Sequence, residues 1–135
     1  FVQPVDLTAT LIDLAGLDGG DDLHGHSLAP LMAGGRVKWP RDCAISSGHI
    51  GDVPPEGTLP MLHAGKWSYC PRDDQNRRPG MLFDMTADPG QKKNVIRKNP
   101  DTANRLERKM AKVLREIGTS DEQVARLLDG VSQAL

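Results

Sequence analysis

The sequence is short of aromatic residues, of cysteine and of long hydrophobic runs. Aromatic residues make up 4% of the 135 residues, so the core must rest on Leu, Val, Ile, Met and Ala. No stretch is long and apolar enough to predict a membrane span, and no amino-terminal leader is recognisable. The formal net charge of −1 argues against a general binder of polyanions. These absences leave the localisation unassigned and favour one domain with a modest core.

Cysteine usage excludes a disulfide framework. The chain has two cysteines, Cys43 and Cys70, which could form at most one bridge. Free thiols are the expected state unless the protein is exported.

The middle of the chain predicts β structure. Short apolar segments at residues 43–47, 61–64, 66–70 and 81–85 have the length and composition of strands. Between them lie polar, charged or proline-rich residues, which are typical of loops. The sequence therefore predicts a small antiparallel sheet of about three or four strands.

A short amphipathic helix is predicted near the start of the chain. Leu7, Leu11 and Leu14 recur at helical spacing. Asp6 precedes them and is a residue type that favours the N-cap position. Gly16 follows them as a stop signal.

The strongest helical signal begins at Pro100, which suits the first position of a helix. An apolar stripe runs from there to Ile117. Beyond it, Ser120 and Gln123 have the spacing of a capping box before a second, shorter helix. We therefore expect an α+β fold in which the long amphipathic helix packs on the sheet.

Three segments together resemble the carboxy-terminal part of the sulfatase family. Residues 5–17 (VDLTATLIDLAGL) are similar to its V-D-L-x-P-T-L-L-D-L-A-G pattern, and residues 25–34 (GHSLAPLMAG) to G-x-S-L-x-P-L-L-x-G. Residues 81–95 (MLFDMTADPGQKKNV) are similar to L-Y-D-L-x-x-D-P-x-E-x-x-N-L. The three occur in the family's order and span most of the chain.

The resemblance implies one sulfatase C-terminal-like domain over residues 1–135. Residues 1–35 would be a helical segment that belongs to the larger domain, residues 41–90 the antiparallel sheet and residues 99–135 the helices. The first helix would pack in the family against a sheet that lies outside this chain. Its leucines would then need another cover, and a symmetric dimer would provide one.

The same resemblance implies chemistry that this chain does not carry. The family uses a formylglycine, made from Cys or Ser in a C/S-x-P-x-R motif, together with Ca²⁺ or Mg²⁺. No such motif occurs here: Cys70, Pro71 and Arg72 have the right residue types at the wrong spacing. We expect no catalytic residue and no cofactor in this chain.

Two sets of side chains are candidate sites. His24 and His26, beside Asp21 and Asp22, are weak candidates for a Zn²⁺ or Ni²⁺ site, although His26 falls at a variable position of the second motif and a solvated loop is the simpler interpretation. If the sheet borders the substrate pocket as it can in the family, the candidates for the pocket wall are as follows: His49, Asp52, Glu56 and His63.

Two carboxylates near the third motif suggest acid–base chemistry, but turn formation explains them better. Asp88 begins an Asp-Pro-Gly turn, and Asp84 closes the preceding strand. In Lys66-Trp67-Ser68-Tyr69, which resembles a family strand of pattern R/K-W/Y-K-Y/L, Ser68 replaces the second basic residue. Any contact that the basic residue makes in the family is therefore in doubt here.

Three functions follow as hypotheses. The first is a carboxy-terminal fragment of a sulfuric ester hydrolase, inactive alone, that contributes fold closure and part of the substrate-pocket wall. Its partner would be the missing catalytic domain or a second copy of the chain. The second is a stand-alone protein-interaction module. The third is nucleic-acid binding through the basic residues of segment 91–115, although no aromatic residues are interleaved with them.

Overall fold

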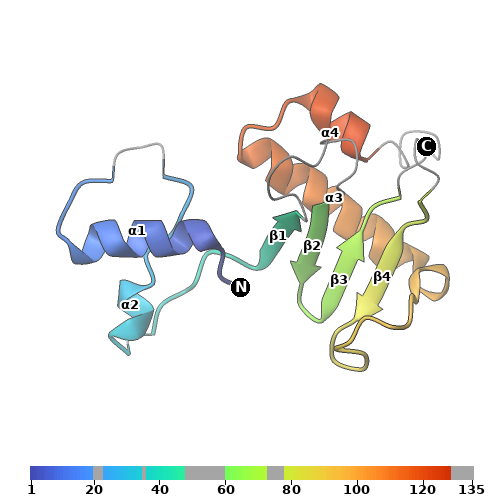
Figure 1. Ribbon diagram of the computed structural model, residues 1–135, viewed down its shortest axis with the longest axis horizontal. Coiled ribbons are helices and arrows are strands. Elements are labelled where there is room, and N and C mark those ends of the chain that lie inside the picture. The colour runs from blue at the N-terminus through green and yellow to red at the C-terminus, as the bar shows by residue number, and fades with distance from the viewer. Residues whose placement is uncertain (20–22, 35, 48–59, 73–77, 129–135) are drawn as a thin grey trace. The chain divides into compact units, whose positions relative to one another are not determined.

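The computed structural model describes residues 1–19, 23–34, 36–47, 60–72 and 78–128 (Figure 1). The chain falls into two units, residues 1–44 and 45–135. The first contains two helices, and the second contains most of a sheet and the carboxy-terminal helices. The expected division into residues 1–35, 41–90 and 99–135 of a single domain stays a prediction.

The first unit is built on α1 (Pro4–Leu14) and the short α2 (Ala29–Met32). The prediction that Asp6 is the N-cap of the first helix is wrong. Gln3 is the N-cap, Pro4 occupies the first turn, and Asp6 is the third helical residue of a capping box, where its carboxylate accepts a hydrogen bond from the Gln3 backbone N–H (2.8 Å).

The leucine stripe of α1 is exposed. Leu7, Leu11 and Leu14 are 56%, 69% and 61% exposed, whereas the buried residues of the helix are Asp6, Ala9 and Thr10. The periodicity predicted the helix correctly, and the apolar stripe is left without a cover among the described residues. An exposed apolar stripe of this kind is typical of an interaction surface.

Four antiparallel strands form one sheet in the order β1-β2-β3-β4 (Figure 1). Their bounds are Cys43–Ser47 for β1, Pro60–Ala64 for β2, Trp67–Cys70 for β3 and Met81–Asp84 for β4. Gly65 connects β2 to β3 with a positive φ of 56°, a conformation that favours glycine. The predicted strands are confirmed to within a residue or two.

The segment after β4 is a turn organised by side chains. Asp84 accepts hydrogen bonds from the backbone N–H groups of Thr86 (3.1 Å) and Ala87 (3.3 Å), and Asp88 accepts one from that of Lys93 (2.7 Å). Asp84 also pairs with Lys66 (2.6 Å). Both carboxylates therefore shape the turn, as the Asp-Pro-Gly pattern predicted.

The helical region begins with a 3₁₀ turn, η2 (Ile96–Lys98), and continues with α3 (Pro100–Glu116) and α4 (Asp121–Leu127). The buried stripe of α3 packs against β2 and β3, so this helix covers one face of the sheet (Figure 1). The capping box of α4 is present, with the Ser120 hydroxyl accepting from the Gln123 N–H. The α+β fold, with a long helix on a small antiparallel sheet, is confirmed.

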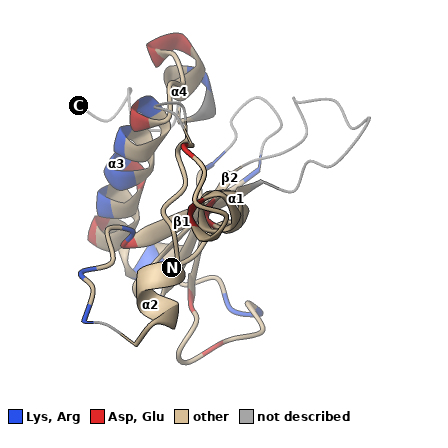
Figure 2. Ribbon diagram, turned by 90° about the vertical axis from the view of Figure 1, so that its left-hand side faces the viewer, with Lys and Arg blue, Asp and Glu red and all other residues tan. Residues whose placement is uncertain are grey.

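Lys and Arg residues recur along α3 (blue in Figure 2), at exposed positions between the buried residues of its apolar stripe. Several take part in contacts within the helical region: Arg115 pairs with Asp121 (2.6 Å), and Lys112 with Glu116 (3.6 Å). Such pairs are ordinary for a solvated helix face. Nucleic-acid binding by this face stays a prediction.

The structure bears on the expectations about the two cysteines and about a membrane span. Cys43 and Cys70 are both buried thiols. Among the described residues, no helix combines the length and the apolar character that crossing a membrane would require.

Candidate functional site

The register of the strands assigns the polar side chains of the sheet to two faces. Leu62 pairs with Tyr69, and Tyr69 with Leu82; these residues share the face that α3 covers. Residues one step along each strand point to the opposite face. His63 pairs with Ser68 there, and Ser68 pairs with Phe83.

The row Ser46, His63 and Ser68 is the candidate functional site, and we call it the polar row. The Ser46 Oγ lies 3.1 Å from the His63 Nε2, within hydrogen-bond distance. Beside His63, Ser68 is 0% exposed, and its Oγ has no hydrogen-bond partner among the described residues. A buried hydroxyl without a partner is uncommon, because it costs about 1–3 kcal/mol.

The side chains of the polar row can both donate and accept hydrogen bonds. Half-buried His63 can donate or accept at a ring nitrogen, and each serine hydroxyl can do both. Among the described residues, no carboxylate contacts the imidazole of His63 in the way that orients a catalytic base. The arrangement is suited to contact with a polar molecule.

The structure places one of the four predicted wall residues. His63 lies on β2 in the polar row, on the face of the sheet opposite α3. His49, Asp52 and Glu56 lie outside the described residues. Whether all four line one surface therefore stays a prediction. Sequence reasoning did not find Ser46, although its position in a predicted strand next to the histidine-bearing one was the available signal.

On the other face of the sheet, Tyr69 forms a hydrogen bond with Glu107 of α3. Both residues are buried, at 3% and 7% exposure. Burial raises the pKa of Glu107 above its usual range, although the hydrogen bond from Tyr69 and the charge of Arg72 oppose that change. Burial and the nearby Glu107 carboxylate raise the pKa of Tyr69. The pair is thus a protonated phenol held against a desolvated carboxyl group.

Sequence reasoning missed this pair, but a signal was present. Glu107 falls on the buried stripe of α3, which otherwise consists of Ala103, Leu106, Met110 and Leu114. A charged residue at a core position of an amphipathic helix requires a partner. Only the pairing of strand and helix identifies that partner as Tyr69.

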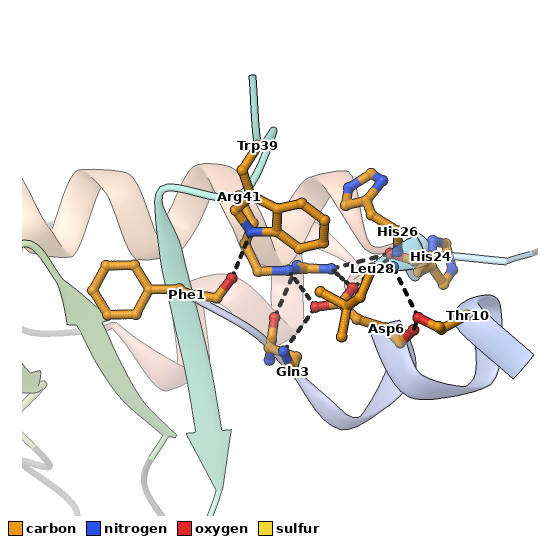
Figure 3. A network of polar contacts seen from close by, with 9 residues as sticks. All are labelled: Phe1, Gln3, Asp6, Thr10, His24, His26, Leu28, Trp39 and Arg41. Carbon is orange, nitrogen blue, oxygen red and sulfur yellow. Dashed lines mark hydrogen bonds and ion pairs between the residues drawn. The ribbon is translucent and has the colours of Figure 1, made fainter. Parts of the chain in front are cut away.

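A second buried carboxylate, Asp6, organises the first unit (Figure 3). Its two oxygens accept from the guanidinium of Arg41 at 2.6 and 3.1 Å. They also accept from the backbone N–H groups of Gln3 (2.8 Å) and His26 (2.9 Å). Thr10 adds a further link, since its hydroxyl donates to the Asp6 carbonyl and accepts from the Leu28 N–H.

The Asp6 network is structural. Burial by itself would raise the pKa of Asp6, but the hydrogen bonds from Arg41, Gln3 and His26 outweigh it and lower that pKa to about 2. The side chain is fully buried and its oxygens are occupied by four donors. The network therefore ties α1 to the loop that carries His26.

The Asp6 network contacts His24 and His26 through their backbone atoms. The carbonyl of His24 accepts from Arg41 (3.4 Å), and the ring of His26 meets that of Trp39 edge-on, with centroids 6.0 Å apart (Figure 3). Asp21 and Asp22 lie outside the described residues. Within the described parts of the chain, no three His, Cys, Asp or Glu side chains are grouped to hold a metal ion. Binding of a metal ion by His24 and His26 together with Asp21 and Asp22 stays a prediction.

Comparison with known proteins shows what the chain is similar to. No protein-family model matches it. It is 32% identical to arylsulfatase K of Gallus gallus over 126 residues, which is 86% of this chain and 22% of the relative. The chain therefore spans about a fifth of the length of the curated relatives it matches.

Solved structures give the same result for the fold. The chain matches a 2-O GAG sulfatase with a TM-score of 0.69 and 26% identity, over 83% of this chain and 24% of that one. A phosphonate monoester hydrolase from Silicibacter pomeroyi matches with a TM-score of 0.67 over 84% of this chain and 25% of that one. At 22% identity, the latter shows the fold alone.

Proposed function

This chain belongs to the sulfatase family, as a carboxy-terminal part of it, and from that premise we propose that it closes the fold of a sulfuric ester hydrolase and supplies part of the wall of its substrate pocket. By itself the chain is inactive. The reaction of the family needs a formylglycine precursor in a C/S-x-P-x-R motif, and the 135 residues contain none. The formylglycine and the Ca²⁺ or Mg²⁺ would come with the rest of the enzyme.

The observation that carries the wall assignment is the polar row. Within the row, Ser46 and His63 are accessible on the sheet face opposite α3, and this pair can contact a polar substrate. Ser68 lies beneath this pair, fully buried, and its hydroxyl has no hydrogen-bond partner among the described residues. Ser68 also stands where the family strand has a basic residue, so any contact that the basic residue makes in other members is not made by a charged side chain here.

The exposed stripe of α1 supports the role in fold closure. Leu7, Leu11 and Leu14 would be covered by the catalytic domain of the same enzyme or by a second copy of the chain. Burying them against either partner would stabilise the assembly by several kcal/mol, at about 1.5–3 kcal/mol for each leucine that becomes fully buried. The same stripe favours the alternative function, a stand-alone protein-interaction module.

Assaying the isolated chain with an aryl sulfate and Ca²⁺ or Mg²⁺ tests the proposed inactivity. We expect no turnover above the rate without protein. Turnover that a chelator abolishes would contradict the proposal. Salt-dependent retention on heparin together with a DNA mobility shift would instead favour the basic face of α3 as a nucleic-acid site.

A chimeric enzyme tests the proposal that this chain forms part of the substrate-pocket wall. Arylsulfatase K of Gallus gallus, with its matching segment replaced by this chain, should retain arylsulfatase turnover. His63→Ala in the chimera should raise KM with kcat less affected, because a wall residue binds the ground state and the transition state alike. Lys112→Ala is the control, since Lys112 is 76% exposed on the α3 side. Equal KM values for the two variants would refute the wall role of His63.

Sedimentation of the isolated chain distinguishes between the two partners that could bury the exposed leucines of α1, a second copy of the chain and the catalytic domain. A dimer that dissociates when Leu11→Glu is introduced would identify a second copy of the chain. A monomer that binds an apolar dye, and loses that binding when mixed with the amino-terminal part of a sulfatase, would identify the catalytic domain. A monomer that binds no dye would contradict both.

A further inference from the structure

The contact between Tyr69 of β3 and Glu107 of α3 lies inside the helix–sheet packing of the second unit. Tyr69 is 3% and Glu107 7% exposed, and the two side chains are hydrogen-bonded to each other. They lie on the α3 side of the sheet, opposite the polar row. This contact therefore takes no part in the proposed pocket wall.

A negative charge on Glu107 would be only weakly compensated. Among the described residues, the titratable and charged groups that face it are Tyr69, Arg72 just beyond β3 and Arg97 of η2. Both arginines are exposed, so water screens their charges. Burial raises the pKa of Tyr69, so the phenol is neutral and offers a hydrogen bond but no charge.

The other elements packed against α3 add no charge at Glu107. The one titratable residue of β2, His63, lies on the opposite face of the sheet. The residues three and four positions from Glu107 on its own helix are uncharged: Ala103, Asn104, Met110 and Ala111. The nearest charged residues of α3 and those of α4 are exposed: Arg105, Arg108, Asp121, Glu122 and Arg126.

A cavity of about 280 Å³ between β3, η2 and α3 gives the pair access to water. Tyr69 and Glu107 line it together with exposed residues, among them Arg72, Arg97 and Pro100. Because exposed residues line the same cavity, water can reach the carboxyl group and exchange a proton with it. The cavity also offers ionised Glu107 room to draw in water, at the expense of the contact between helix and strand.

We propose that the contact of Glu107 with Tyr69 is a pH-sensitive switch, which holds α3 against β3 when Glu107 takes up a proton and loosens when Glu107 releases it to water. The protonated carboxyl group is neutral and keeps its hydrogen bond with the phenol, so its burial costs little. The carboxylate carries a charge, and burying a charge without a strong partner is costly.

The direction of the effect follows from proton linkage. Burial raises the pKa of Glu107 in the folded chain above its ordinary value of 4.5. The folded state therefore binds the proton more tightly than the unfolded state does, and protonation stabilises the second unit. This contribution is complete below the ordinary value and is lost as the pH rises through the folded value.

Urea unfolding of the full chain between about pH 8 and pH 5 tests the switch, with Trp67 of β3 as the fluorescent probe in a Trp39→Phe background. We expect the ratio of folded to unfolded second unit to rise as the pH falls. The rise should be about tenfold per pH unit at most, which is the limit for uptake of one proton.

Glu107→Gln replaces the carboxyl group with a neutral group of nearly the same shape. The variant should unfold at a higher urea concentration than the parent at pH 8 and should lose most of the rise. Glu116→Gln, at a side chain 59% exposed on the same helix, is the matched control and should keep the rise. His63 titrates in the same range but is present in every variant, so the difference between parent and Glu107→Gln isolates Glu107.

Tyr69→Phe provides a second variant. The hydrogen bond from Tyr69 favours the ionised form of Glu107, so its loss should move the midpoint of the rise to higher pH. A ¹³C titration of the Glu107 carboxyl group in the parent chain reads the same midpoint directly.

Three results would overturn the switch. A Glu107→Gln variant less stable than the parent at pH 8 would show that the carboxylate is held by an ion pair, with Arg72 as its partner. An equal pH dependence in the parent and in Glu107→Gln would show that another group takes up the proton. A Glu107 carboxyl resonance that titrates at or below 4.5 would show that burial does not favour the neutral form. None of these results depends on whether His63 contacts a substrate.

Discussion

Two buried carboxyl groups of this chain have pKa values shifted in opposite directions. Burial opposes ionisation of both, but Asp6 receives a guanidinium and two backbone N–H donors, which hold its pKa at about 2. For Glu107, burial outweighs the hydrogen bond from Tyr69 and the charge of Arg72, so its pKa is raised. Asp6 therefore serves as a structural anchor that is ionised at neutral pH, and Glu107 is a weaker acid buried between β3 and α3.

The first unit should lose stability in acid because of Asp6. Its pKa is lowered from 3.8 to about 2 on folding, so its contribution is complete above the unfolded value and is lost as pH falls through the folded value. The shift corresponds to about 2 kcal/mol, lost between about pH 4 and pH 2. Urea unfolding followed by Trp39 fluorescence in a Trp67→Phe chain measures it.

Asp6→Asn provides the comparison for this pH dependence. The variant is expected to be less stable at neutral pH, because it leaves the guanidinium of Arg41 buried without its charged partner. Its free energy of unfolding should change less between pH 4 and pH 2 than that of the parent. An equal pH dependence in both proteins would show that another group is responsible.

At the scale of elements, Asn94 joins the end of the sheet to the helical region. Its Oδ1 accepts from the backbone N–H groups of Leu82 (3.0 Å) and Ile96 (3.1 Å), and its Nδ2 donates to the Gly80 carbonyl (3.1 Å). The adjacent Val95 N–H donates to the Leu82 carbonyl (2.8 Å). One side chain thus aligns β4 with the start of η2, which in turn leads into α3.

Asn94→Ala should destabilise the second unit by about 1–3 kcal/mol, because it leaves the Leu82 N–H in the sheet without its acceptor. Thermal or urea unfolding of the chain measures the change. Lys93→Ala is the matched control, since the neighbouring side chain is exposed and only the Lys93 backbone joins the turn. A loss no larger than that of the control would mean that the backbone contacts alone hold this corner.

At the scale of the whole molecule, the two units differ in how much apolar surface each buries internally. The second unit buries Leu62, Leu82, Met110 and Val124 almost completely. The buried residues of α1 in the first unit are instead Asp6, Ala9 and Thr10, and its leucines are exposed. Hydrophobic burial drives folding, so the second unit has the stronger basis for independent stability.

Residues 41–135 should therefore fold without the first forty residues. We expect a cooperative thermal transition and a mixed helix and strand signal by circular dichroism. A peptide of residues 1–40 should show little helix in water, since isolated helices as short as α1 are marginal. A non-cooperative melt of residues 41–135 would contradict this, and the full chain provides the reference.

Much of the second unit could be predicted because its signals are local. The strands followed from short apolar segments between loops, and α3 followed from Pro100 and a sustained apolar stripe. The capping box of Ser120 and Gln123 placed the start of α4 correctly. The family resemblance rested on three motifs in order, and the comparisons support it. Each of these signals involves residues close together in the chain.

By itself, then, the sequence determined the kind and the approximate bounds of the elements, the turn after β4 and the family. Only the tertiary structure decided the roles of the buried polar groups. Asp6 is an ion-pair anchor because Arg41, 35 residues away, reaches it. Glu107 meets Tyr69, and Ser46 meets His63, because helix packing and strand pairing bring them together. Periodicity and capping act over a few residues, whereas the environment of a buried charge is set by neighbours distant in sequence.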